Sequence, residues 1–379
     1  MKLASNFDHD DGVVRNPAVY QLAKACCTSM ERDRFISLRL VQCLTLIAVY
    51  ELGHAIFPEA YVTIGHASRL GGMIGLHNKT LAQQLFVTAD TWTCGEEQRR
   101  TWYVNIGTRY LPPSVLEPCL DALLPVNDRD WNEGRISASE SLLTTSFHST
   151  ANLGSFARTC QAAHILNKVL KHRDHRTHSG QDTETVLHEA LALHGALVAL
   201  EESLAPHCVF FGDSHNDESA GTVDSPSTHP GPEVVVTATS PGMENALALS
   251  LSASARMMLY KIYGPNEPKA GYGGGRTALE TQMQRLSLAG TRDLVLRLGS
   301  GLAGGVTCGG ATSPMLSSLS YHVAKECAWL IKEDYDTTMY QALRKLVDSL
   351  RQLATEWQVA QEYLALLEKG EILGLIPDE

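Results

Sequence analysis

The spacing of apolar residues constrains this chain more than any other feature, because it follows the helical period almost throughout. From Arg34 to His54, apolar residues recur three or four positions apart, and a second set fills another face. Such a pattern is typical of a central, largely buried α-helix. No convincing run alternates apolar and polar residues as a half-buried β-strand does. The sequence therefore predicts an all-α, multi-helix fold.

The same periodicity predicts further helices, separated by segments rich in glycine and proline. They are expected at about 59–76, 93–110, 138–175, 183–204, 243–263, 277–298, 314–334 and 340–368. Ser, Thr, Pro, Gly and Asp dominate 212–242, which predicts a flexible linker or loop. The expected organisation is an N-terminal segment (1–33), the first part of a helical domain (34–211), this linker (212–242) and the second part (243–379).

The start of the 93–110 helix carries a dense set of charges. Thr93 and Glu96 have the spacing of a capping box, in which each residue satisfies a backbone N–H of the other. Glu96 and Glu97 precede Arg99 and Arg100 by three or four positions, which is the spacing of ion pairs on one helix. The predicted role of this cluster is a capped helix start with local pairs, and the alternative is a charged site that reads a ligand.

Composition excludes several classes of protein. The chain has 379 residues, of which 44% are hydrophobic, so it is not mainly disordered. Its 31 Lys and Arg against 42 Asp and Glu give a net charge of −11, which opposes DNA binding over the whole surface. Nine cysteines show no C-x-x-C spacing and are expected to be reduced thiols. The most apolar stretch, 40–57, includes polar and charged residues, so no membrane span is expected.

Three strips of sequence together resemble one family. They are Gly65-His66-Ala67-Ser68-Arg69-Leu70, then Glu96-Glu97-Gln98-Arg99-Arg100-Thr101-Trp102-Tyr103, then Leu124-Pro125 with Asp128 and Trp131 to Gly134. In order and spacing they are similar to the fungal-specific transcription factor domain, the middle homology region of fungal binuclear zinc-cluster regulators. The resemblance covers about 35–135 and, less closely, 314–368.

The resemblance implies an all-α regulatory domain of a nuclear transcriptional regulator, which we expect to control a fungal pathway, specifically a secondary-metabolite gene cluster. DNA contact in this family comes from a module of six cysteines and two zinc ions. Only Cys26 and Cys27 precede Arg34, so this module is not recognised in the sequence. We therefore expect action through a DNA-bound zinc-cluster partner, through a homodimer, or through a zinc-cluster module encoded upstream. The sequence also departs from the family at Thr108-Arg109, where the family tends to have Asp-Arg.

A small-molecule effector is a further expectation. His66 and Arg69 lie one helical turn apart, and Arg100 and Trp102 lie on the following helix. These four residues are the predicted effector pocket. The alternative is that they are buried polar residues that tie helices together.

No pattern supports catalysis, and we expect no catalytic, metal-binding or DNA-binding residues and no cofactor. The G-x-G-x-x-G at 299–304 follows a helical pattern where a dinucleotide site requires a strand. His172, His175 and His178 could bind zinc, but an exposed helix end or loop is favoured. His188-Glu189 and His194 lack the spacing of a metalloprotease helix. The alternative of another class is a metabolite-binding or enzymatic protein on the same scaffold, which needs ionisable groups converging in one cleft.

The 3-4 spacing in 340–368 favours a core helix, with a dimerising coiled coil as its alternative.

Overall fold

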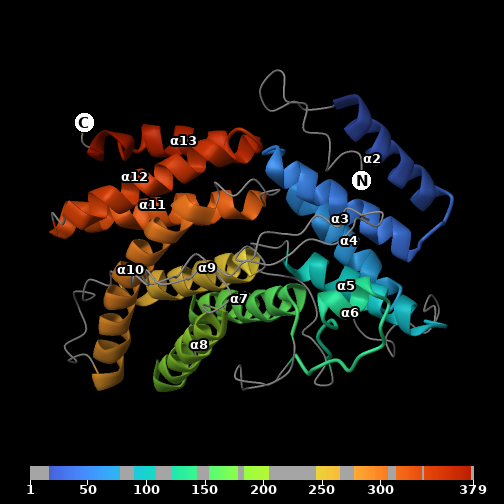
Figure 1. Cartoon of the computed structure of the whole chain (residues 1–379), viewed down its shortest axis with the longest axis horizontal. Coiled ribbons are helices and arrows are strands. Elements are labelled where there is room, and N and C mark those ends of the chain that lie inside the picture. Colours follow the sequence, from blue (N-terminus) through green and yellow to red (C-terminus); the bar gives the residue numbers. More distant parts are fainter. Residues whose placement is uncertain are drawn as a thin grey trace, which may run out of the picture.

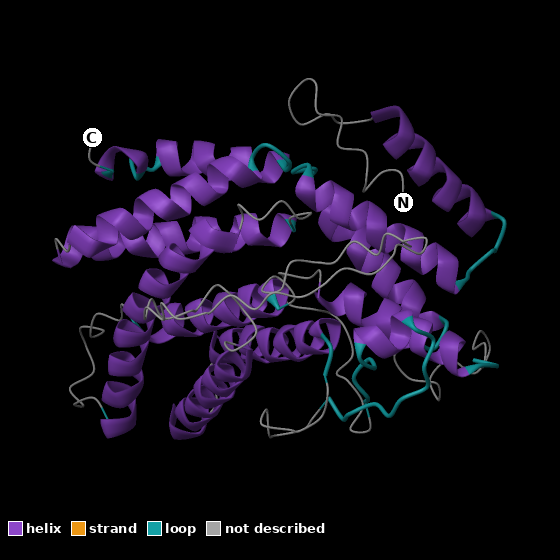
Figure 2. Ribbon diagram, viewed as in Figure 1, coloured by secondary structure: helices purple, strands orange, loops and turns teal. Residues whose placement is uncertain are grey.

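A computed structural model describes the protein over nine stretches: 17–76, 89–107, 122–142, 153–177, 183–204, 245–264, 277–305, 313–334 and 337–376. Within these residues the fold is all-α, as predicted, and Figure 2 shows helices joined by loops without strands. The α-helices, in chain order, are α2 (Pro17–Arg32), α3 (Leu38–Gly53), α4 (Glu59–Met73), α5 (Trp92–Gly107), α6 (Asp128–Asn132), α7 (Ser155–Thr177), α8 (Thr183–Leu204), α9 (Ala246–Tyr263), α10 (Ala278–Gly305), α11 (Pro314–Asp334), α12 (Thr337–Leu353) and α13 (Gln358–Lys369). The predicted linker at 212–242 lies outside the described residues.

Local chemistry explains where several helices begin. Ser37 caps α3, because its hydroxyl accepts a hydrogen bond from the Leu40 backbone N–H (3.3 Å). A reciprocal capping box opens α10: Thr277 accepts from the Glu280 N–H at 3.2 Å, and Glu280 accepts from the Thr277 N–H at 2.9 Å. Pro17 begins α2, a position where proline costs no hydrogen bond. This helix falls inside the expected N-terminal segment.

Two larger apolar cores, and a small one that joins α5 to α7 around Tyr103 and Ala157, organise the helices. Figure 1 shows how these helices are arranged. One of the two larger cores, which we call the N-terminal core, is built from α2, α3 and α4 around Leu40, Val41 and Ala67. The larger C-terminal core is built mainly from α7 to α13. Helix α9 lies at its centre and contacts α7, α8, α10 and α11. Burial on nearly every side explains why α9 is apolar along most of its length.

Trp357 joins the two cores. The last predicted helix, 340–368, is wrong as a single element, because the chain turns between α12 and α13 at residues 354–357. Trp357 is 8% exposed and precedes α13 in an extended conformation. Its ring lies against Gly53 at the end of α3, where an added Cβ would overlap it. The 3-4 stripe is buried in the core of its own chain, which supports the core interpretation of the repeat.

Helices α9 and α10 also approach closely, at Gly290. A Cβ at Gly290 would overlap the ring and hydroxyl of Tyr260, which is 1% exposed. We expect Gly290→Ala to lower the free energy of unfolding by about 1–3 kcal/mol, because the buried ring has to shift. Gly195→Ala in α8 is the matched control, since its Cβ would meet nothing within 4 Å, and it is expected to stabilise by about 0.5–1 kcal/mol. Urea denaturation of both variants checks this, and equal effects would contradict the close approach.

Candidate functional site: a glutamate–arginine network between α5, α6 and α7

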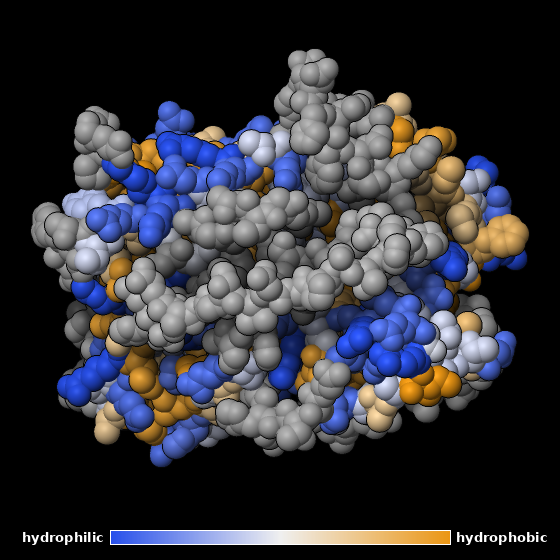
Figure 3. All heavy atoms as spheres, in the orientation of Figure 1, coloured by the Kyte–Doolittle hydropathy of each residue, from blue (hydrophilic) through white to orange (hydrophobic). Residues whose placement is uncertain are grey.

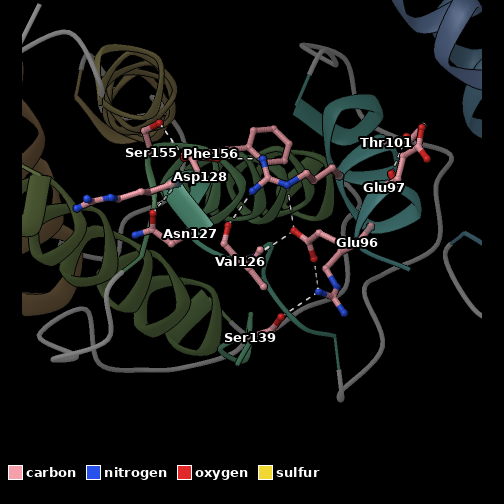
Figure 4. A network of polar contacts seen from close by, with 12 residues as sticks. Glu96, Glu97, Thr101, Val126, Asn127, Asp128, Ser139, Ser155 and Phe156 are labelled. Carbon is pink, nitrogen blue, oxygen red and sulfur yellow. Dashed lines mark hydrogen bonds and ion pairs between the residues drawn. The ribbon is translucent and has the colours of Figure 1, made fainter. Parts of the chain in front are cut away.

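Glu96 is the centre of a polar network at the start of α5 (Figure 4). Its side chain is fully buried. One carboxylate oxygen accepts hydrogen bonds from Arg100 Nε at 3.0 Å and from the Val126 backbone N–H at 2.9 Å. The other accepts from Arg99 at 2.5 Å. The predicted local pairs of Glu96 are thus confirmed, and its contacts extend to a segment 30 residues further along the chain. The predicted partners of Glu97 are wrong, because this residue contacts Gln42 and Arg39 of α3.

Arg100 carries the network from α5 to α6. Its guanidinium donates to Asp128 Oδ1 at 2.9 Å and to the Val126 carbonyl at 2.8 Å. The rings of Trp131 and Phe156 flank it, with centroids 5.1 and 5.2 Å from the guanidinium carbon. Contacts of this kind hold a planar cation in place. Arg100 therefore directs its charge to groups of its own chain.

Asp128 completes the network at the start of α7. Its second carboxylate oxygen accepts from the Phe156 N–H at 3.0 Å and from the Ser155 hydroxyl at 3.1 Å. A carboxylate in this place satisfies an unpaired helix N–H and the positive end of the helix dipole. Residue 154 is glycine because an added Cβ would clash with Asp128. One buried acid, Glu96, and one half-buried acid, Asp128, thus lock α5 to α7 through a single arginine.

The predicted capping box at Thr93 is wrong. Helix α5 begins at Trp92, and Thr91 supplies the cap by accepting from the Cys94 N–H at 3.2 Å. Glu96 is turned toward Arg99, Arg100 and Val126. Spacing alone predicted a local partner for Glu96. Because its carboxylate is buried, each additional hydrogen-bond donor reduces the cost of burying the charge, and the larger set of donors is more stable.

The four residues of the predicted effector pocket contact different neighbours. His66 Nε2 lies 2.9 Å from Glu31 of α2, and Arg69 is exposed on α4. Trp102 is buried on α5 opposite Gly71, whose added Cβ would lie 3.5 Å from the ring. Arg100 faces α6 and α7. These contacts bring Trp102 to α4 but do not gather all four side chains around one point.

A second network lies in the C-terminal core, and sequence reasoning missed it. Arg256 of α9 is 4% exposed and forms an ion pair with Glu201 of α8. It also donates to Asp293 of α10 at 3.3 Å and to the Tyr260 hydroxyl at 2.9 Å. Burial lowers the pKa of Arg256, but the charge of Glu201 and the contacts with Tyr260 and Asp293 together raise it above its usual value, so the guanidinium stays charged. A lone arginine within the apolar run of α9 is the sequence signal that points to such a pair.

His194 joins this second network and gives it a pH dependence. The Tyr260 hydroxyl, which accepts from Arg256, lies 3.0 Å from His194 Nδ1 and can donate to it while the ring is neutral. Burial, and then the charge of Arg256, lower the pKa of His194 below its usual 6.5. The unfolded chain therefore binds this proton more readily than the folded one, so stability is lost as pH falls below 6.5.

We expect wild-type protein to lose more free energy of unfolding than His194→Gln between about pH 7 and about pH 5. Glutamine keeps an acceptor for the Tyr260 hydroxyl and does not titrate in this range. Denaturation curves at several pH values give the comparison, since the groups shared by both proteins cancel in the difference. Parallel pH profiles would rule out a contribution from His194.

The other predicted sites are structural where they are described. His172 is fully buried between Glu189 (2.8 Å) and the Tyr263 hydroxyl (2.7 Å), so the expectation of an exposed helix end is wrong for it. His178 lies outside the described residues. The G-x-G-x-x-G at 299–304 lies inside α10 and does not follow a strand, and Gly299 lies close to Ala342. Across the described ranges, no group of three or more His, Cys, Asp or Glu could hold a metal ion.

These observations define a class of protein: an all-α protein whose buried ionic groups join helices to one another. None of the helices in the described parts is long and apolar enough to cross a membrane.

Comparison with known proteins adds one partial relative. The chain is 44% identical over 82 residues to transcription factor BOA15 of Botryotinia fuckeliana (strain B05.10). The match spans 22% of this chain and 45% of that protein. No protein-family model matches the chain, and no solved structure does.

The comparison thus supports a role in transcriptional regulation, because a partial homologue is named a transcription factor. It agrees with the resemblance to a transcription factor domain but does not identify the specific fungal domain. Because the match covers less than half of that protein, the activity and partners of a whole regulator come to this chain only as proposals.

Proposed function

We propose that the chain is a helical regulatory unit of a fungal transcriptional regulator. The observation that carries this proposal is the 44% identity over 82 residues to a protein named a transcription factor. The helical fold and the inward-directed ionic networks fit a unit that transmits or holds a conformation. Within the described stretches, these networks do not present a converging set of free acids and bases of the kind that catalysis on a bound substrate requires.

The chain is proposed to act in the nucleus and to reach DNA through a zinc-cluster module, held by a partner or belonging to the same regulator. Its net charge of −11 opposes direct binding to the phosphate backbone. The regulated genes are proposed to form a secondary-metabolite cluster, and a small-molecule effector that contacts His66, Arg69, Arg100 or Trp102 is part of the same proposal.

Transcript profiling of a strain lacking the gene tests the regulatory role. Transcripts of one set of genes are expected to change, and the wild-type gene is expected to restore them. A second strain carries Arg100→Met, which removes the bridge between α5 and α7 and is expected to behave like the deletion. Its control is Arg129→Met, which removes an exposed arginine paired only with Glu133 among the described residues. Unchanged transcripts in the deletion strain would exclude the proposed function.

A gel-shift assay separates direct from indirect DNA binding. The purified chain alone is expected to give no sequence-specific shift on promoter DNA of the affected genes. A shift that requires an added zinc-cluster regulator supports action through a partner, and a specific shift by the chain alone contradicts it.

A further inference from the structure

Helix α2 lies at the edge of the molecule (Figure 1), and few of its side chains are buried. Only Tyr20 and Cys27 of α2 belong to the buried part of the N-terminal core. On its outer side, Val19 and Leu22 are 36% and 64% exposed. Figure 3 shows apolar surface over this end of the molecule. A helix with so little buried apolar area opens at a lower free energy than the core helices do.

The first anchor of α2 is a buried carboxylate on α3. Glu51 is 0% exposed, and one of its oxygens accepts from the Tyr20 hydroxyl at 2.7 Å and from Lys24 Nζ at 2.8 Å. Its other oxygen has no hydrogen-bond partner among the described residues. A buried carboxylate without a cation is costly, so this position requires a helix that brings a lysine.

In the second anchor the acid lies on α2 and its partner lies on α4. Glu31, near the end of α2, lies 2.9 Å from His66 Nε2, and Cys27 is buried between the two anchors. The contacting positions, Tyr20, Lys24, Cys27 and Glu31, are spaced 4-3-4 and share one helical face. The surface of α3 and α4 under α2, which we call the α2 groove, therefore recognises a helix by shape, by charge at Glu51 and by a polar contact at His66.

The connection between α2 and α3 contains a strained residue. Arg34 has φ of 64°, a left-handed conformation that disfavours side chains larger than glycine. It lies just beyond the end of α2, and Phe35 beside it is 67% exposed. Short connections under strain favour exchange of the element they join between two copies, because opening the turn relieves the strain.

We propose that the α2 groove is an interaction surface for α2 of a second copy, so that two chains form a reciprocal dimer by exchanging this helix. A second copy supplies the complete set of anchors, Tyr20, Lys24, Cys27 and Glu31, and each interaction that opens within one chain forms again between the two. This dimer is the homodimeric form of the proposed regulator, but the surface and its test do not depend on transcription.

Two charge-reversed chains test the exchange. The helix variant carries Lys24→Glu with Glu31→Lys, and the groove variant carries Glu51→Lys with His66→Glu. Within either variant, like charges meet at the Glu51 anchor in both a closed monomer and a homodimer. In a mixture, the reversed helix of the helix variant fits the reversed groove of the groove variant. The unchanged helix of the groove variant fits the unchanged groove of the helix variant. Complementary partners then meet at all four anchors only when the two different chains exchange α2.

Mass measured by light scattering after size-exclusion chromatography is the readout. Wild-type protein is expected to shift toward the mass of two chains as its concentration rises, because exchange is bimolecular. Each variant alone is expected to keep the mass of one chain, and the equimolar mixture to reach that of two. A mixture and a wild-type protein that both keep the mass of one chain at every concentration overturn the proposal.

A milder pair of variants keeps the test valid if Glu51→Lys prevents folding. Glu31→Lys and His66→Glu change only partly exposed side chains, and mixing them is expected to raise the fraction of dimer above that of either alone. Tagged and untagged wild-type chains, incubated together and then captured by the tag, give an independent readout. Failure to recover untagged chain would count against exchange and would leave the transcript changes of the proposed function unaffected.

Discussion

Replacing Glu96 by alanine is expected to lower the free energy of unfolding by about 3 kcal/mol, because it removes the acceptor on which one buried network depends. The carboxylate is fully buried and satisfies Arg99, Arg100 and the Val126 N–H together. Without it, two half-buried guanidinium groups lose a partner and a buried backbone donor is left unpaired. Urea denaturation followed by circular dichroism measures the effect.

Glu97→Gln is the matched control. Glu97 is the next residue on the same helix, but it is partly exposed and contacts Gln42 at 3.0 Å and the exposed Arg39 at 3.7 Å. Ion pairs near the surface contribute less than about 1 kcal/mol, and glutamine keeps an acceptor for Gln42. A loss at Glu97 as large as the loss at Glu96 would show that overall charge on α5, and not burial, determines the stability.

The second large effect is expected at Arg256, in the C-terminal core. Arg256→Met leaves the Glu201 carboxylate buried at 4% exposure without its main cation. Breaking a buried pair by removing one partner typically costs about 3–5 kcal/mol, since the remaining charge is uncompensated. Arg297, 3.9 Å from Glu201 and itself paired with Asp293, recovers part of this loss. Thermal or urea unfolding gives the size of the change.

A double variant separates the attraction within the pair from the cost of an uncompensated charge. Arg256→Met combined with Glu201→Leu removes both charges and keeps the volume of the site, and buried pairs replaced in this way are often close to neutral. The double variant is therefore expected to be more stable than Arg256→Met alone. If it is less stable, the ion pair itself contributes strongly, and the uncompensated carboxylate is not the cause of the loss.

The helices that were easiest to predict are those whose apolar pattern is bounded by clear stop signals. The expected helix at 183–204 coincides with α8 (Thr183–Leu204), and the expected start at Glu59 coincides with that of α4. The helix expected from Arg34 begins later, at Leu38, because Ser37 provides the cap. The helix expected from 138 is wrong at its start: residues 138–142 are not helical, and Leu142 donates to the Ala122 carbonyl at 2.8 Å.

The break between α12 and α13 shows why periodicity alone failed there. Leu353 and Ala360 are both fully buried, so the apolar spacing continues across the break. The chain nevertheless leaves the helix at Ala354, and the large ring of Trp357 is placed against Gly53, near the other end of the sequence. A contact so distant in sequence leaves no periodic signal. Helix α2 was missed for the opposite reason, because its apolar face is narrow and half of its anchors are charged.

The contacts of the candidate site also divide into those that the sequence predicts and those that it does not. Pairs within one helix, such as Glu96 with Arg99 and Arg100, follow from spacing. The contacts of Arg100 with Asp128 and of Arg256 with Glu201 do not, because only the packing of separate helices brings them together. Sequence can therefore indicate which polar residues will be buried, and the fold determines their partners.

Because Trp357 packs into the space left by Gly53, its fluorescence can report on the contact between the two halves of the molecule. The two halves of the molecule cannot slide past each other without moving the indole ring of Trp357. Its neighbour just beyond the end of α3 is His54, with ring centroids 6.3 Å apart. Indole emission depends on its surroundings, so a regulatory partner that shifts one half against the other is expected to change the intrinsic fluorescence without any added label.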